Sequence, residues 1–168
     1  IILAMWASHH LWHENITFAK IQNYELVHHH LEAHSVFGLF ISIMLLTAAC
    51  AKSAQFPFSS WLPRAMEGPT PSSAIFYGSL SVHLGLFLLI RTMPFWEHQL
   101  IARIMIGSVG IFTAAIGASI GRVQSSVKSQ IAYASVAQIG LMFLEVALGF
   151  KNFALFHFAG NAFLRTYQ

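Results

Sequence analysis

The sequence predicts an all-α membrane protein built as a bundle of transmembrane helices. Hydrophobic residues make up 56% of the 168 residues and charged residues only 9%, and the mean hydropathy is +0.62. About a quarter of the residues of a soluble domain are charged. The apolar residues also fall into runs separated by short polar or Pro- and Gly-containing segments, and a helix needs roughly 20 mostly apolar residues to cross the lipid hydrocarbon. We therefore expect about five spans in a lipid bilayer.

Residues 1–34 are expected to hold the end of a preceding span, over about residues 1–7, and a polar loop over residues 8–34. The sequence starts without an initiator methionine or a signal-peptide pattern, and the last apolar stretch stops soon after it starts near Phe153. We therefore expect a fragment of a longer chain. The loop is rich in histidines, which are His9, His10, His13, His28, His29, His30 and His34.

Imidazoles can ligate zinc, but no HExxH pattern is present and no cysteine joins the loop. We interpret this loop as solvated and predict no metal site and no cofactor. The net charge of +3 lacks a basic cluster with interleaved aromatic residues, so we predict no nucleic-acid partner.

Residues 35–168 are predicted to be part of a transmembrane domain that is truncated at both ends. The expected spans cover about residues 35–55, 72–90, 100–120 and 129–149, and a fifth begins near residue 152. The third is rich in Gly, Ala and Ser, which let helices approach closely. We interpret Cys50 as a small packing residue within the first span.

A lysine and a series of helix-breaking residues separate the first span from the second. Lys52 ends the apolar run, and the breakers that follow are Pro57, Gly68, Pro69 and Pro71. Lipid tolerates a broken helix only where the backbone is buried in protein or lines a hydrated cavity. An ionisable residue within a span costs about 2.5 to 3.5 kcal/mol and usually has a function. Lysine and break together predict an ion path, although a lysine that reaches the interface from a helix end is the open alternative.

Three stretches carry a family resemblance: "KSAQFPFSSWLPRAMEGPTPSSAIFYGSLSVHLGLFLLIR", "SVKSQIAYASVAQIGLMF" and "LFHFAGNAFLR". They resemble the antiporter-like membrane subunits of respiratory complex I and of multisubunit cation/proton antiporters, over about residues 35–168. Within this family, "SSAIFYGSLSVHLGLFLL" and "NAFLRTYQ" look most similar to the membrane subunit of the DAB inorganic-carbon accumulation system. The partner of that subunit is a soluble zinc protein resembling a carbonic anhydrase.

The resemblance implies roles for residues of the first two spans. Lys52 corresponds to the family's buried proton-handling lysine, and removal from water makes an ammonium group release its proton more readily. Tyr77 stands where the family has a histidine, and a tyrosine hydroxyl passes a proton but rarely holds an extra one. His83 is either a replacement for that histidine or a buried histidine with satisfied hydrogen bonds.

In the last helix, His157 matches the family's first histidine, Asn161 replaces the second and Arg165 replaces a lysine. A spacing of four residues puts all three on one helix face. Arginine cannot release its proton at accessible pH, so we expect Arg165 to act as a fixed positive charge, with interfacial anchoring as the alternative. We also expect it to reach the fourth span near Gln138 or Glu145.

Two further charged residues belong to the fourth span and the turn before it. Glu145 shares a helix face with Gln138 and is expected to balance Lys52 or Arg165 and to pass protons, unless it is exposed at the helix end. Lys128 lies in the polar turn between the third and fourth spans, where interfacial anchoring is the favoured interpretation.

The sequence thus predicts a proton- or cation-translocating subunit that couples ion movement to a partner complex. The favoured version energises inorganic-carbon uptake with a zinc carbonic-anhydrase-like partner in a bacterial inner membrane. The alternative is a proton-pumping subunit of NADH-quinone oxidoreductase or of a multisubunit Na⁺/H⁺ antiporter. A scaffold whose ion path has decayed is a third possibility. The chain has no GxGxxG motif and no cysteine cluster, so it would be enzymatic only through a complex to which it belongs.

Overall fold

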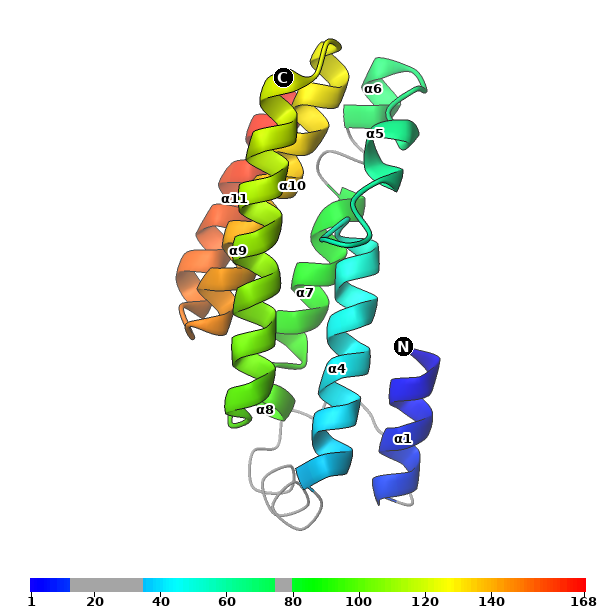
Figure 1. Cartoon of the computed structure of the whole chain (residues 1–168), viewed down its shortest axis with the longest axis vertical. Helices are drawn as coiled ribbons and strands as arrows, with labels where there is room; N and C mark the ends of the chain where they lie inside the picture. The colour runs from blue at the N-terminus through cyan, green and yellow to red at the C-terminus, as the bar shows by residue number, and fades with distance from the viewer. Residues whose placement is uncertain (13–34, 75–79) are drawn as a thin grey trace.

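The computed structural model describes residues 1–12, 35–74 and 80–168, and the regular elements of these residues are helices that run mostly along one long axis (Figure 1). The histidine-rich loop beyond residue 12 and Tyr77 lie outside the described residues. The longer helices are α1 (Ile2–Trp12), α4 (Ser35–Lys52), α7 (Leu84–Arg91), α9 (Leu100–Val123), α10 (Val127–Ala147) and α11 (Lys151–Tyr167). The short ones are α5 (Trp61–Ala65), α6 (Thr70–Ser72), the 3₁₀ turn η2 (Ser81–His83) and α8 (Met93–Trp96).

The helices lie where the apolar runs predict spans. Among the described residues, α9 and α10 are the helices long and apolar enough to cross a membrane, whereas Val36–Lys52 and Ser81–Arg91 are shorter apolar segments. The second predicted span differs most from expectation, because its described part consists of the end of α6 and then η2 with α7. The expected all-helical bundle is confirmed.

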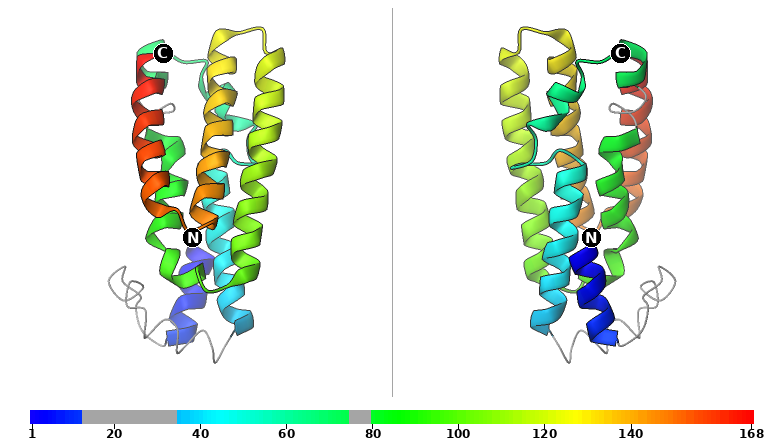
Figure 2. Two further views of the ribbon diagram at one scale, coloured as in Figure 1. Left: turned by 90° about the vertical axis from the view of Figure 1, so that its left-hand side faces the viewer. Right: turned by 90° about the vertical axis from the view of Figure 1, so that its right-hand side faces the viewer.

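Small residues allow α9 and α10 to pack with their backbones in contact. A Cβ atom built on Gly110 would lie 2.5 Å from the Gly140 carbonyl oxygen, and one on Gly117 would lie 3.2 Å from the Tyr133 carbonyl oxygen. The two helices are antiparallel neighbours in both side views (Figure 2). The turn between them ends at Ser126, whose hydroxyl accepts a hydrogen bond from the Ser129 amide as a helix N-cap.

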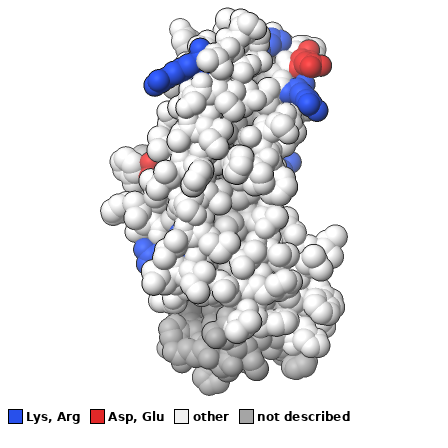
Figure 3. All heavy atoms as spheres, viewed as in Figure 1, with Lys and Arg blue, Asp and Glu red and all other residues white. Residues whose placement is uncertain are grey.

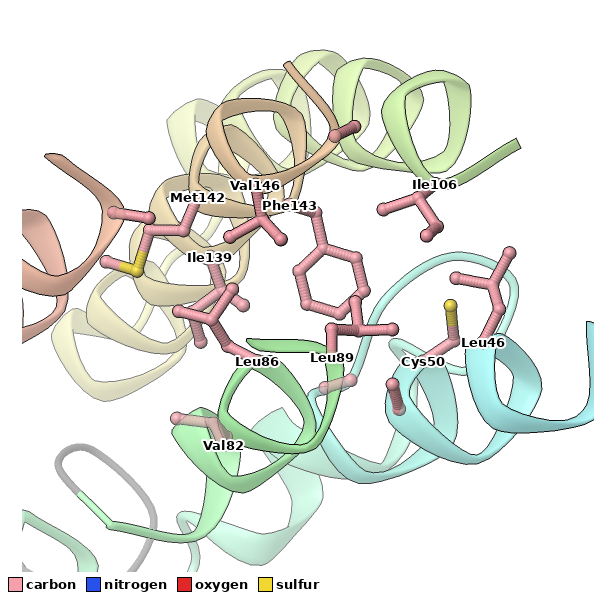
Figure 4. Close-up of a cluster of buried hydrophobic side chains, with 14 of the residues drawn as sticks. Leu46, Cys50, Val82, Leu86, Leu89, Ile106, Ile139, Met142, Phe143 and Val146 are labelled. Atoms are coloured by element: carbon pink, nitrogen blue, oxygen red, sulfur yellow. The ribbon is translucent and has the colours of Figure 1, made fainter. Parts of the chain in front are cut away.

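The apolar core lies between α10 and its neighbours (Figure 4). Phe143 of α10 is fully buried in the middle of this cluster, and Cys50 is buried there as the expected small packing residue. Further members come from α10 itself and from α4, η2, α7 and α9, and include Leu46, Val82, Leu86, Leu89, Ile106, Ile139, Met142 and Val146. The cluster fixes the position of α10 relative to four other elements.

The outer surface of the bundle is largely apolar. Large hydrophobic side chains such as Phe112 on α9 and Phe156 and Phe163 on α11 are exposed. Most of the face in Figure 3 carries no charge, and the charged side chains visible on it gather mainly near the upper end. An exposed apolar surface of this extent is suited to lipid or to other membrane helices and not to water.

Candidate functional site

The first region of interest is the interruption after α4. The helix ends at Lys52, and Ala54 has the left-handed φ of 52°. The Phe56–Pro57 peptide bond is cis, and helical structure resumes at Trp61. The chain therefore changes direction directly after the lysine.

Protein groups from three elements hold the interrupted backbone. The Phe56 amide donates to Thr113 Oγ1 of α9 over 3.0 Å, and the Trp61 indole donates to the Ala51 carbonyl of α4 over 3.0 Å. The Ser53 hydroxyl donates to the Val82 carbonyl of η2. Broken backbone in a membrane protein must find such partners, because lipid offers none.

Lys52 lines a cavity of about 990 Å³ beside this break. Apolar residues of α1, α4 and α7 form most of the wall, and Arg91 is the other cation in it. The Lys52 side chain is exposed, so the described residues do not supply the burial that the family resemblance implies for this lysine. Its role as a proton carrier stays a prediction.

The later part of the interruption is linked to the turn between α9 and α10. Lys128 Nζ donates to the Gly68 carbonyl over 3.0 Å, and α6 begins just after Pro69, with Pro71 in its first turn. Lys128 therefore connects two loops, in addition to the interfacial position expected for it.

The second region is a polar cluster between α10 and α11, formed by Gln138, Glu145 and His157. His157 Nδ1 lies 2.7 Å from Glu145 Oε1, and His157 Nε2 lies 2.8 Å from Gln138 Oε1. The exposed fractions of the His157 and Glu145 side chains are 23% and 15%. The cluster is thus half-buried and has a carboxylate, an imidazole and an amide in direct contact.

One turn further along α11, Asn161 contacts the second-span region. Its Nδ2 donates to His83 Nε2 over 3.1 Å, and the two residues are 4% and 1% exposed. The Phe158 ring lies edge-on to the His83 ring, with 4.8 Å between centroids. The structure therefore makes His83 a buried, hydrogen-bonded histidine that directly contacts the predicted polar face of α11.

Arg165 is buried, but it does not make the predicted contact with α10. Its Nη1 donates to Gln168 Oε1 over 2.6 Å, and His157 takes both Gln138 and Glu145. The expected contact of Arg165 with Gln138 or Glu145 is therefore not seen among the described residues, and the charge balance expected between Glu145 and Arg165 or Lys52 stays a prediction. Because α10 and α11 run antiparallel from a turn at Gly149, Arg165 lies about 12 Å further from that turn than His157 does.

The structure thus brings most of the predicted residues onto the inner face of α11 or into contact with it, and leaves Lys52 apart. His157 with Glu145, then Asn161 with His83, and then Arg165 follow one another along the inner face of α11. Hydrogen-bonded groups that can hold or pass a proton here lie within an otherwise apolar bundle.

Sequence reasoning missed the direct partners of His157. Helical periodicity puts Gln138 and Glu145 on one face of α10, and Gly149, with its φ of 91°, marks a tight connection to α11. A short turn makes residues at similar distances before and after it lie opposite each other. This pattern could have placed His157 between Gln138 and Glu145. No comparable sequence pattern identifies Ser53 and Thr113 as hydrogen-bond partners at the helix break.

The family model described as NADH:quinone oxidoreductase/Mrp antiporter, transmembrane region, matches residues 1–166. NADH-ubiquinone oxidoreductase chain 5 of Rhizopus stolonifer is 45% identical over 126 residues, which is 75% of this chain and 19% of the relative. The chloroplastic NAD(P)H-quinone oxidoreductase subunit 5 of Spinacia oleracea is 38% identical over 80% of this chain and 18% of the relative. The Lemna minor protein of the same name is 36% identical over 89% of this chain.

The chain spans only about a fifth of the length of these relatives. It is therefore a segment comparable to one part of a longer membrane protein, as the sequence predicted. The names of these relatives agree with the quinone-oxidoreductase alternative better than with the inorganic-carbon version of the sequence-based prediction.

Proposed function

The chain belongs to the NADH:quinone oxidoreductase/Mrp antiporter transmembrane family, and from this premise we propose that the full-length protein is a proton-translocating membrane subunit of the complex I type. It lies in a lipid bilayer and couples proton movement to other subunits of a respiratory complex. The names of its relatives support this assignment. The redox chemistry belongs to partner subunits.

The observation that carries this proposal is a pair of polar contacts that follow each other along α11 inside the apolar bundle. The first joins Glu145 to His157 and the second joins Asn161 to His83. The neighbour of His83, Val82, accepts the hydrogen bond of Ser53 at the helix break. Burying so many polar groups within membrane-spanning segments is costly and is retained mainly for ion movement.

In this function, Lys52 is the proton carrier at the break, and the Tyr77 hydroxyl passes protons between spans. His83 and His157 hold protons in transit, Glu145 stabilises the charged form of His157, and Arg165 supplies a fixed positive charge.

The central test is Lys52→Arg in the full-length protein within its complex. Arginine keeps the charge but cannot release a proton, so proton translocation into sealed vesicles should fall at least tenfold at matched membrane abundance. Lys151→Arg, at the exposed start of α11, is the matched control and should keep wild-type translocation. Full translocation in Lys52→Arg would show that the lysine is only an electrostatic fixture.

Arg165 should respond in the opposite way. Arg165→Lys keeps a positive charge and should retain much of the translocation, whereas Arg165→Ala should lose most of it. Equal loss in both variants would contradict the role of a fixed charge.

Energised inorganic-carbon uptake, with a soluble zinc carbonic-anhydrase-like partner in a bacterial inner membrane, is the second candidate. Asn161 and the buried Arg165 favour it, because they depart from the His and Lys pattern of the complex I resemblance. Purifying the full-length protein with its partners distinguishes the two functions. Bound zinc together with a carbonic-anhydrase-like subunit supports carbon uptake, and NADH-dependent quinone reduction supports the respiratory complex.

A further inference from the structure

His157 is held at both ring nitrogens, and its two partners differ in what they offer. Glu145, when ionised, can only accept, so the 2.7 Å contact places a proton on Nδ1. Gln138 carries a carbonyl oxygen and an NH₂ group on the same side chain, so it can accept or donate.

Gln138 Oε1 lies 2.8 Å from His157 Nε2, and in the charged form of the ring this oxygen accepts the Nε2 proton. With both nitrogens donating, the ring is an imidazolium. A half-turn of the Gln138 amide would bring its NH₂ group to the same place, where it donates to the bare Nε2 of a neutral ring. Both charge states of His157 therefore keep two hydrogen bonds without any movement of the backbone.

We propose that Gln138 is a positioning residue that lets His157 take up and release a proton while Glu145 keeps the ring in place; this rests on the proposed proton-translocating function. In the release step, the Nε2–H bond breaks and its electron pair stays on Nε2. The proton passes to a water molecule, which becomes hydronium, and the Gln138 amide turns to donate to the vacated lone pair. The net charge of the α10–α11 polar cluster changes from zero to minus one.

The surroundings of the ring suit this exchange. Glu145 is the acidic group that faces the ring from α10, and its other oxygen, Oε2, is buried without a hydrogen-bond partner among the described residues. The carboxylate is therefore anchored through its bond to His157. From η2, His83 lies beyond Asn161, which donates to its Nε2. On α11 itself, Lys151 precedes the ring and Arg165 lies two turns beyond it. The His157 and Glu145 side chains are 23% and 15% exposed, so the described residues leave one side of the site open, where a water molecule can be placed.

The test uses the full-length protein in its complex and two variants, Gln138→Glu and Gln138→Leu. A second carboxylate at Nε2 stabilises the imidazolium, so the part of the pH profile of translocation that depends on His157 should move to higher pH by about one unit or more. Leucine removes the hydrogen bond to Nε2 in both charge states. Because the bond to the charged ring is the stronger of the two, the His157-dependent part of the profile should move to lower pH. If Gln138→Leu does not accumulate in membranes, Gln138→Met removes the same acceptor with a side chain closer in shape.

Gln130→Glu makes the matched change at an exposed position of α10 and should leave the profile where it is. A structural role alone would lower translocation in the Gln138 variants without opposite shifts of their profiles. Unshifted profiles in both variants would therefore overturn the proposal.

A second readout separates this proposal from the proposed function. In the purified full-length protein in nanodiscs, ¹⁵N NMR follows the titration of the His157 ring, whose signal is identified by its loss in His157→Asn. Midpoints that move in opposite directions in the two variants support the positioning role, even if the protein translocates no protons and the proposed function fails. Normal translocation with unmoved midpoints would overturn the positioning role and leave the function intact.

Discussion

Helix α10 has two interfaces of opposite character. Toward α9 it presents Gly140 and Ala137, and the backbones meet so closely that an added Cβ atom would clash with a carbonyl oxygen. Toward α11 it presents Gln138 and Glu145, whose side chains hydrogen-bond to His157. The first interface leaves no space for rearrangement, whereas at the second the turn of one amide is enough to keep the hydrogen bonds when His157 gains or loses a proton.

This difference indicates how a membrane bundle can hold side chains that gain and lose protons in fixed positions. Polar groups act reproducibly only where their supporting elements are rigid. The glycine contacts with α9 and the buried apolar cluster around Phe143 (Figure 4) hold α10 from two sides. The polar groups on its third side can therefore exchange protons without loss of the fold.

The largest effect should come from breaking the rigid interface. In Gly110→Leu, the new side chain meets the Gly140 carbonyl and forces α9 and α10 apart, so we expect destabilisation by about 3 kcal/mol or more and little full-length protein in membranes. Membrane abundance and thermal unfolding in detergent measure this. Gly160→Leu on α11 is the matched control, since a Cβ there meets nothing within 4 Å; a similar loss in both variants would contradict the backbone contact.

The next largest effect should be a loss of proton translocation in His157→Gln, with assembly intact. His157→Gln keeps a polar side chain near Glu145 but cannot hold a proton, so translocation should fall at least tenfold while the protein accumulates normally. Vesicle proton uptake at matched abundance measures it. His98→Gln, at an exposed position between α8 and α9, should behave as wild type. Unchanged uptake in His157→Gln would remove the α10–α11 polar cluster from the ion path.

A moderate loss of stability is expected from Asn161→Leu. It removes the donor that faces the buried Nε2 of His83, and a buried polar atom that loses its partner costs about 1 to 3 kcal/mol. Thermal unfolding of the purified full-length protein measures this. Asn152→Leu, at the exposed start of α11, provides the comparison, and equal melting temperatures for the two variants would show that the Asn161–His83 contact contributes nothing.

The smallest effect should come from Thr113→Val on α9. Valine has nearly the same shape but cannot accept the hydrogen bond of the Phe56 amide, so the helix break should lose about 1 kcal/mol of support. Hydrogen exchange at the Phe56 amide should become faster. Thr47→Val makes the same change where the hydroxyl donates to the Ile43 carbonyl of α4 over 2.8 Å, and it should leave the exchange rate as it is. An unaltered exchange rate in Thr113→Val would disprove the link between α9 and the break.

Local chemistry made several features predictable. The apolar runs place the helices because each span must satisfy its backbone internally, and Pro57 marks the interruption that follows α4 because proline cannot continue the hydrogen-bond ladder. The shared face of His157, Asn161 and Arg165 follows from helical periodicity. The assignment of Gln138 and Glu145 to Arg165 failed because periodicity gives a residue's face but not its height relative to a neighbouring helix.

Composition is enough to place the chain in lipid and to give its helical class. Intervals along one helix are enough to give the position of the break and the set of candidate residues. Which of these residues contact one another depends on the tertiary structure. His157 bonds to Glu145 because a short turn at Gly149 sets α11 antiparallel to α10. His83 meets Asn161, although the two are far apart in sequence, because the apolar core packs η2 and α7 against α10 beside α11. Such contacts depend on the relative heights and rotations of separate helices, and these are fixed by the packing of all their side chains together.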